Sequence, residues 1–264
     1  VLFRSRDLSS WYRCGAADGN ALELSSASWS EGAYWAPELI RDPESGKYFI
    51  YFSAKSKKGN SSTAYIASER NEYDRLYIGI GISDTPLGPY RMVTAESYYG
   101  SGKTTNLNGE ALNESTPPVN FGKNFKDQLE SMGDKYIDSV TGMGIWPSID
   151  VSPFFTESGD FYIYFSQHTS SAVSGNHIWA LKMKDMVTPD WSTLTKLASP
   201  NWHEYTGKAG SIDDADWKGV KISNDAGGSF DGNINEGTFL IENEGKFYLT
   251  YSPFGYGSRR YSDR

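Results

Sequence analysis

The sequence predicts an all-β fold, and within that class it favours a β-propeller. The first reason is a segment of aromatic and β-branched residues that follows a turn glycine and occurs three times, at 46–53, 159–166 and 245–252. Residues of these types favour buried strands over helices. Three copies of one strand pattern predict a sheet unit that is repeated along the chain.

The second reason is the position of two acids. Asp150 lies nine residues before Gly159, and Glu236 lies nine residues before Gly245, so the two carboxylates are predicted to occupy the same place in two repeats. The blades of a propeller surround a shared axis. Equivalent acids in different blades are therefore expected to converge on one central pocket.

Length and composition limit the possible functions. The 264 residues fit one large all-β domain, and the aromatic content of 15% suits both strand packing and flat platforms for sugar rings. The formal net charge of −8 argues against nucleic acid or an anionic membrane as the main partner. No apolar run is long enough to span a bilayer. Cys14 is the only cysteine, so no disulfide forms within the chain.

The first complete sheet unit is expected from Trp35 to about Tyr90. Residues 41–46, Arg-Asp-Pro-Glu-Ser-Gly, have the composition of a hairpin turn, because proline sets φ and glycine accepts positive φ. Residues 86–89, Pro-Leu-Gly-Pro, form the turn beyond the unit. The predicted strands are 35–41, 46–54, 62–68 and 77–83.

Residues from about 91 to 148 break the strand pattern and are predicted to be an insertion between blades. Pro117 and Pro118 exclude a helix at that point, whereas Asn120 can cap a short helix near 123–132. The insertion either narrows the mouth of the pocket, as loops on a rigid scaffold often do, or is a surface excursion.

Two further units follow the insertion. A second one is expected from Trp146 to about Trp191, and a long polar connector at 199–233 leads to a third that opens at Asn235. The predicted strands of these units are 149–155, 160–167, 176–183, 193–198, 236–241 and 246–252.

The motifs in these units resemble glycoside hydrolase family 43. The matching segments follow the order of the family's motifs along the chain and are Trp35-Ala36-Pro37-Glu38, Ser83-Asp84-Thr85-Pro86-Leu87-Gly88-Pro89-Tyr90, Ile149-Asp150-Val151-Ser152-Pro153-Phe154-Phe155 and Asn235-Glu236-Gly237-Thr238-Phe239. The resemblance implies a five-bladed β-propeller with four-stranded antiparallel blades. Residues 1–11 resemble the end of an earlier blade. We therefore expect residues 1–264 to be a single catalytic propeller domain that is truncated at both ends, with about three blades present.

The resemblance also implies roles for the two acids. Glu236 matches the family's general acid, although most relatives have proline where this chain has Thr238. Asp150 matches the aspartate that raises the pKa of that acid and orients it. Without the resemblance, Glu236 also fits an acid at an exposed strand start, and Asp150 also fits a turn before a strand.

The catalytic base of the family is an aspartate at the start of the first blade, and no residue of this chain matches it. Asp7 lies in the blade-ending segment, and Asp42 lies in a predicted hairpin turn. We therefore expect the base to lie upstream of Val1, and the chain alone to be inactive.

Aromatic residues flank the two acids. Trp35 matches the tryptophan that lines the family's sugar subsite, and Tyr34, Trp146 and Phe155 are further candidates for substrate contact. No histidine, cysteine or acid spacing predicts a metal site, and no cofactor is expected, although the family implies a possible structural calcium.

The resemblance implies an inverting glycosidase that acts on arabinose- or xylose-containing plant polysaccharides or oligosaccharides, of the α-L-arabinofuranosidase, β-xylosidase or arabinanase type. One alternative is a propeller glycosidase of the fructan- and sucrose-cleaving type, which Arg41-Asp42-Pro43 resembles. The other is a sugar-binding propeller or pseudoenzyme. Each has a carbohydrate partner, and none indicates an oligomeric state. Because polysaccharides are large, we expect a secreted, periplasmic or extracellular protein.

Overall fold

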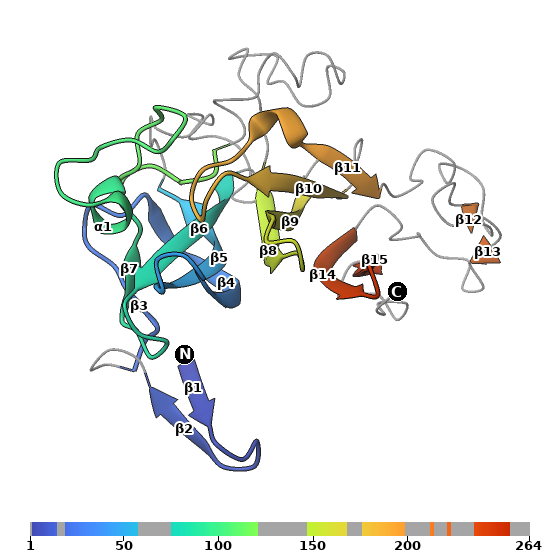
Figure 1. Cartoon of the computed structure of the whole chain (residues 1–264), viewed down its shortest axis with the longest axis horizontal. Coiled ribbons are helices and arrows are strands. Elements are labelled where there is room, and N and C mark those ends of the chain that lie inside the picture. Colours follow the sequence, from blue (N-terminus) through green and yellow to red (C-terminus); the bar gives the residue numbers. More distant parts are fainter. Residues whose placement is uncertain are drawn as a thin grey trace.

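The computed structural model of the chain consists of small curled β-sheets (Figure 1), as an all-β propeller fold predicts. It describes residues 2–14, 19–57, 75–120, 147–167, 176–198, 212–213, 221–222 and 235–253. Within these ranges no helix is long and apolar enough to cross a membrane. The predicted helix near 123–132 lies outside them, as does Trp146.

We call the sheet that follows the N-terminal region the first blade. Its strands, in hydrogen-bonded order, are β3 (Leu22–Glu23), β7 (Tyr90–Met92), β6 (Leu76–Ser83), β5 (Tyr48–Ser56) and β4 (Ser30–Arg41). β5 pairs directly with β6, and the strand predicted at 62–68 lies outside the described residues. The strand predicted at 77–83 is the third of the blade, and β7, which follows the Pro86–Pro89 turn, is the fourth.

The other two blades match the predicted strands. The second blade contains β8 (Ser148–Phe155), β9 (Phe161–Gln167), β10 (His177–Met183) and β11 (Thr195–Ala198), with a 3₁₀ turn η3 (Trp191–Thr193) before β11. The third blade is the hairpin of β14 (Asn235–Asn243) and β15 (Lys246–Pro253). Two further hairpins consist of β1 (Leu2–Ser5) with β2 (Trp11–Cys14) and of β12 (Ile212–Asp213) with β13 (Lys221–Ile222).

Consecutive blades pack face to face, and their interfaces hold the hydrophobic core. In the first seam, between the first and second blades, Phe49, Tyr51 and Ile78 pack with Ile163 and Phe165. The second seam lies between the second and third blades, where two small clusters contain Tyr164, Ala180, Leu240, Ile178, Ala198 and Tyr251. Because side chains alternate along a strand, β5 and β9 contribute to the first seam with their odd positions and to the opposite face of their blade with their even ones.

The predicted insertion starts later than expected and is partly core. Residues 91 and 92 belong to β7, and the helix α1 (Ala95–Tyr99) follows, capped by Thr94. Val93, Ala95, Leu112 and Val119 are buried in the first seam. Residues 93–120 therefore contribute side chains to the core and are not only the surface excursion that one of the two predictions describes.

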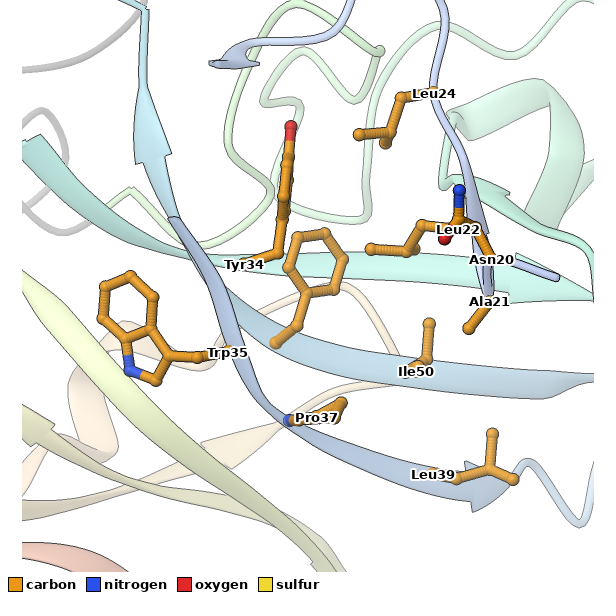
Figure 2. A pocket seen from close by; sticks show the side chains of 10 residues that line it. Asn20, Ala21, Leu22, Leu24, Tyr34, Trp35, Pro37, Leu39 and Ile50 are labelled. Atoms are coloured by element: carbon orange, nitrogen blue, oxygen red, sulfur yellow. The ribbon is translucent and has the colours of Figure 1, made fainter. Parts of the chain in front are cut away.

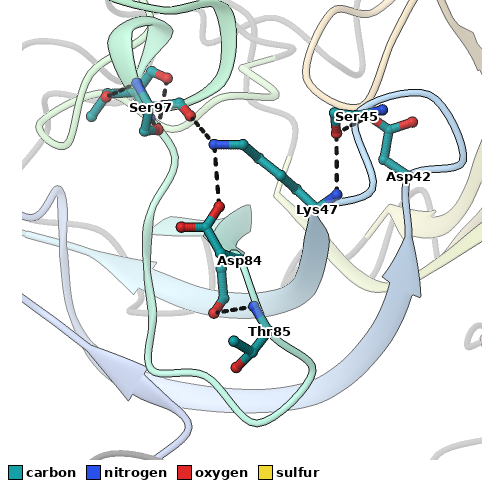
Figure 3. Close-up of polar contacts among 8 residues, drawn as sticks. Asp42, Ser45, Lys47, Asp84, Thr85 and Ser97 are labelled. Atoms are coloured by element: carbon teal, nitrogen blue, oxygen red, sulfur yellow. Dashed lines mark hydrogen bonds and ion pairs between the residues drawn. The ribbon is translucent and has the colours of Figure 1, made fainter.

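Lys47 joins α1 to the first blade (Figure 3). Its Nζ donates a hydrogen bond to the carbonyl oxygen of Ser97 over 2.9 Å and lies 3.5 Å from a carboxylate oxygen of Asp84. Beside it, the Asp42 carboxylate accepts hydrogen bonds from the backbone N–H groups of Glu44 and Ser45. Asp42 thus stabilises the β4–β5 turn, as the turn composition predicts.

Gly79 leaves room for an aromatic ring, and this gives a prediction about stability. A Cβ at Gly79 would lie 2.3 Å from Cζ of Phe52, its cross-strand partner. We expect Gly79→Ala to lower the free energy of unfolding by about 1–3 kcal/mol, because the buried Phe52 ring must move. Urea denaturation measures this change. The double variant with Phe52→Leu should recover part of it, whereas additive losses would contradict the proposed clash.

Candidate active site

The first strand of each blade carries a β-bulge at the same place. Trp35, Ile149 and Glu236 pair with serines that end the repeated segment, Ser53, Ser166 and Ser252. The residue after each of them has a positive φ: 46° at Ala36, 52° at Asp150 and 68° at Gly237. A bulge bends a strand and redirects its side chains. The repeat therefore places a residue with a positive φ at the same position of the first strand in all three blades.

This register corrects the predicted equivalence of the two acids. Asp150 corresponds to Gly237, whereas Glu236 corresponds to Ile149, one position earlier in its strand. The equal nine-residue spacing arises because the β8–β9 hairpin turns through residues 156–160 and the β14–β15 hairpin through residues 244–245 only. The prediction that the two acids occupy the same place in two repeats is therefore wrong by one residue, although the blades still bring them together.

Asp150 is held by groups from all three blades. Its backbone N–H donates to Oγ of Ser53 over 2.9 Å, and its carbonyl oxygen accepts from Oγ1 of Thr238 over 3.4 Å. Its carboxylate accepts hydrogen bonds from the backbone N–H of Gly237 and the indole N–H of Trp35. Burial raises the pKa of Asp150, and these two donors partly oppose the rise. A non-glycine residue at positive φ is uncommon, and here contacts on both sides stabilise it.

Glu236 lies close enough to Asp150 for the two charges to interact. Burial is the main cause that raises the pKa of Glu236 to about 7, and the negative charge of Asp150 adds to it. Within the described residues, no group donates a hydrogen bond to its carboxyl. A carboxyl in this setting keeps its proton near neutral pH, which a general acid requires.

The raised pKa of Glu236 predicts how stability depends on pH. The folded-state pKa of about 7 exceeds the ordinary value of 4.5, so the folded chain binds more protons than the unfolded chain between these values. We therefore expect the free energy of unfolding to contain a contribution from Glu236 that is complete below about pH 4.5 and is lost as the pH rises to about 7. Urea denaturation across this range measures it. Glu236→Gln should flatten the slope, and an equal slope in both proteins would contradict the prediction.

The aromatic residues predicted to contact substrate divide into two groups. Tyr34 and Trp35 line a cavity of about 490 Å³ together with Leu22, Pro37, Leu39 and Phe52 (Figure 2). Neither Asp150 nor Glu236 lines this cavity, and Trp35 connects the two regions through its hydrogen bond to Asp150. Phe155 stacks on Phe161 at the far end of β8, with ring centroids 4.6 Å apart. The structure therefore does not bring Phe155 to the acids.

A third carboxyl group, Glu38, was not selected from the sequence. Its Oε2 accepts a hydrogen bond from Oγ of Ser152 over 3.2 Å, across the first seam. Burial raises its pKa, and the serine partly opposes the rise. Glu38 ends the Trp-Ala-Pro-Glu motif that begins at Trp35, and this motif could have identified it from the sequence.

The two aspartates considered as bases both lie in turns. The carboxylate of Asp7 accepts hydrogen bonds from the backbone of Ser9 and Ser10 between β1 and β2, and these hold its pKa below the ordinary range. Asp42 is buried in the β4–β5 turn. In the described part of the chain, no group of three or more His, Cys, Asp or Glu side chains could hold a metal ion.

Comparison with solved structures identifies the fold. An endo-1,4-β-xylanase from Bacteroides thetaiotaomicron matches 99% of this chain with a TM-score of 0.54 and 21% identity, over 57% of its own length. A thermostable family-43 glycoside hydrolase and an endo-arabinase from B. thetaiotaomicron each match 99% of the chain with a TM-score of 0.52, at 20% and 19% identity, over 58% and 64% of their lengths.

The resemblance to glycoside hydrolase family 43 is thus confirmed for the fold. The chain spans about three fifths of the length of these structures. No protein-family model matches the sequence, and a search of curated proteins found no match.

Proposed function

We propose that this chain belongs to an inverting glycoside hydrolase, in which Glu236 is the general acid and Asp150 raises the pKa of that acid and orients it. The observation that carries the proposal is the convergence of two half-buried carboxyl groups from adjacent blades, one of them held by donors from both sides. Two acids side by side destabilise a fold unless one of them keeps its proton. A contribution to stability therefore does not explain this pair, whereas a catalytic function does.

The geometry supports a division of labour between the acids. Protonated Glu236 donates its proton to the glycosidic oxygen as the bond from that oxygen to the sugar breaks. A base on the opposite face of the sugar takes a proton from the water that attacks the anomeric carbon. The hydrogen bonds from Gly237 and Trp35 favour the ionised form of Asp150 and partly oppose the rise in its pKa that burial causes.

The substrate class follows from the resemblance and from the structural neighbours. Two of these are named as enzymes of xylan and arabinan chemistry. We therefore propose arabinose- or xylose-containing plant polysaccharides or oligosaccharides as substrates, with α-L-arabinofuranosidase, β-xylosidase or arabinanase activity. The half-exposed rings of Tyr34 and Trp35 are platforms on which a sugar can stack.

The alternatives have less support. The fructan-type interpretation depends on Asp42, whose carboxylate is occupied by the β4–β5 turn. A sugar-binding protein without activity is favoured only by the missing base.

The test is to incubate the full-length gene product with arabinosides and xylosides and to follow the anomer of the first product by NMR. An inverted product supports the proposal. A retained product would favour the fructan-type enzyme, and binding without cleavage would favour the sugar-binding protein.

A further inference from the structure

The third blade carries an exposed apolar face. The first and third blades lie on either side of the second (Figure 1). On the third blade Phe239, Ile241 and Tyr248 are 54%, 46% and 49% exposed. Ile241 pairs with Tyr248 across the hairpin and lies two positions from Phe239, so the three side chains share one face of the sheet, opposite Leu240. An apolar patch of this kind marks a surface for interaction with another protein.

The first blade has a cavity on the face that points away from the second blade. Leu39 and Ile50 pair across β4 and β5, and both line this cavity of about 490 Å³. Tyr34 and Phe52 also line it (Figure 2). Leu39 and Tyr34 remain exposed at its rim. The cavity is therefore an apolar recess that can receive side chains from another sheet.

The first seam shows how blades of this kind pair. Phe49 and Tyr51 are the fourth and sixth residues of the repeated segment, counted from its turn glycine. They pack on Ile163 and Phe165, which are the fifth and seventh residues of the next copy of the segment. A blade therefore meets the next blade with its fourth and sixth residues, and that blade answers with its fifth and seventh.

The second seam repeats this arrangement. Tyr162 and Tyr164, again the fourth and sixth residues, pack with Leu249, the fifth residue of the third copy. We call the face with the fourth and sixth residues the forward face of a blade, and the opposite face its back face. Tyr248 then lies on the forward face of the third blade, and Ile50 on the back face of the first. The two faces that no neighbouring blade covers are thus the two unlike halves of one more seam.

We propose that the forward face of the third blade docks on the back face of the first blade in a second copy of this chain. Phe49 holds the same position as Tyr248 and is fully buried by the second blade. The docking buries Tyr248 and Phe239 in the same way, against the cavity that Leu39 lines. Because the two faces differ, the contact is heterologous, and copies associate head to tail into a ring or an open chain.

This proposal is independent of the proposed catalytic function. Further blades of a full-length protein would compete for the same two faces, so the test uses the chain of residues 1–264 alone.

The test uses one variant for each face, Tyr248→Lys and Leu39→Lys. Both positions are exposed, so each new charge blocks docking without entering the core. Sedimentation velocity of the wild-type chain at increasing concentration should show association, and each variant should raise the dissociation constant by about tenfold or more. Leu107→Lys, at an exposed apolar residue outside both faces, should associate as the wild type does.

A mixture of the two lysine variants distinguishes head-to-tail docking from every other contact. It contains one intact forward face and one intact back face, so it should form a dimer and nothing larger, although neither variant associates alone. A contact between like faces would instead leave one variant able to dimerise alone, and this result would overturn the proposal. A wild-type chain that stays monomeric up to its highest soluble concentration would also overturn it. If a lysine variant does not fold, Tyr248→Ser and Leu39→Ser replace it with the same expected outcomes.

Discussion

Glu236→Gln in the full-length protein is expected to lower kcat by about 10²–10⁴-fold on a substrate with a poor leaving group. The amide has nearly the shape of the protonated carboxyl but cannot transfer a proton to the glycosidic oxygen. Substrate affinity should change little, because the general acid stabilises mainly the transition state. The measurement is kcat and KM for an unactivated oligosaccharide, together with direct binding by calorimetry.

Two controls make this prediction specific. A nitrophenyl glycoside should restore much of the activity of Glu236→Gln, since its leaving group departs without protonation. Glu244→Gln, at the exposed turn after the same strand, should behave as the wild type. Full activity of Glu236→Gln on the unactivated substrate would remove Glu236 from the mechanism.

Asp150→Asn is expected to have the second largest effect. Asparagine tolerates the positive φ of 52° as well as aspartate does, and its Oδ1 still accepts a hydrogen bond. The substitution removes the negative charge that contributes to the raised pKa of Glu236. The pKa of Glu236 should therefore fall, so that less of it is protonated at neutral pH. We expect kcat to fall by about 10²-fold or more, and the basic limb of the pH–rate profile to move to lower pH.

The pH dependence separates this effect from a loss of folding. Glu157→Gln, in the exposed β8–β9 turn, removes a charge from the same hairpin and should leave the basic limb in place. If Asp150→Asn lowered kcat but left the basic limb unmoved, Asp150 would act by orienting Glu236 and not through its charge.

Much of the fold could be predicted from the sequence because its signals are local. The turn glycines and the aromatic and β-branched runs identified β5, β9 and β15 nearly to the residue, since side-chain type and turn chemistry act over a few positions. The short strand β7 was missed because three residues after a turn carry little pattern.

The geometry of the site depends on contacts that no local pattern contains. Counting from the turn glycines made the two acids equivalent, whereas the bulges and the unequal hairpin loops shift them by one position. Trp35 was predicted to contact sugar, and the structure adds its hydrogen bond to Asp150. The bulge residues also depend on partners in other blades, as the hydrogen bond between Asp150 and Ser53, 97 positions apart, illustrates.

The sequence by itself determined the order of the blades and most of the strands that build them, because these depend on residue types and short spacings. It also selected the two acids as candidates. Only the tertiary structure decided that Glu236 lies close to Asp150, and that Gly237 and Trp35 donate to the carboxylate of Asp150. The physical reason is that register, bulges and seam contacts are set by pairing between distant segments. A shift of one residue in that pairing changes which side chains reach the axis.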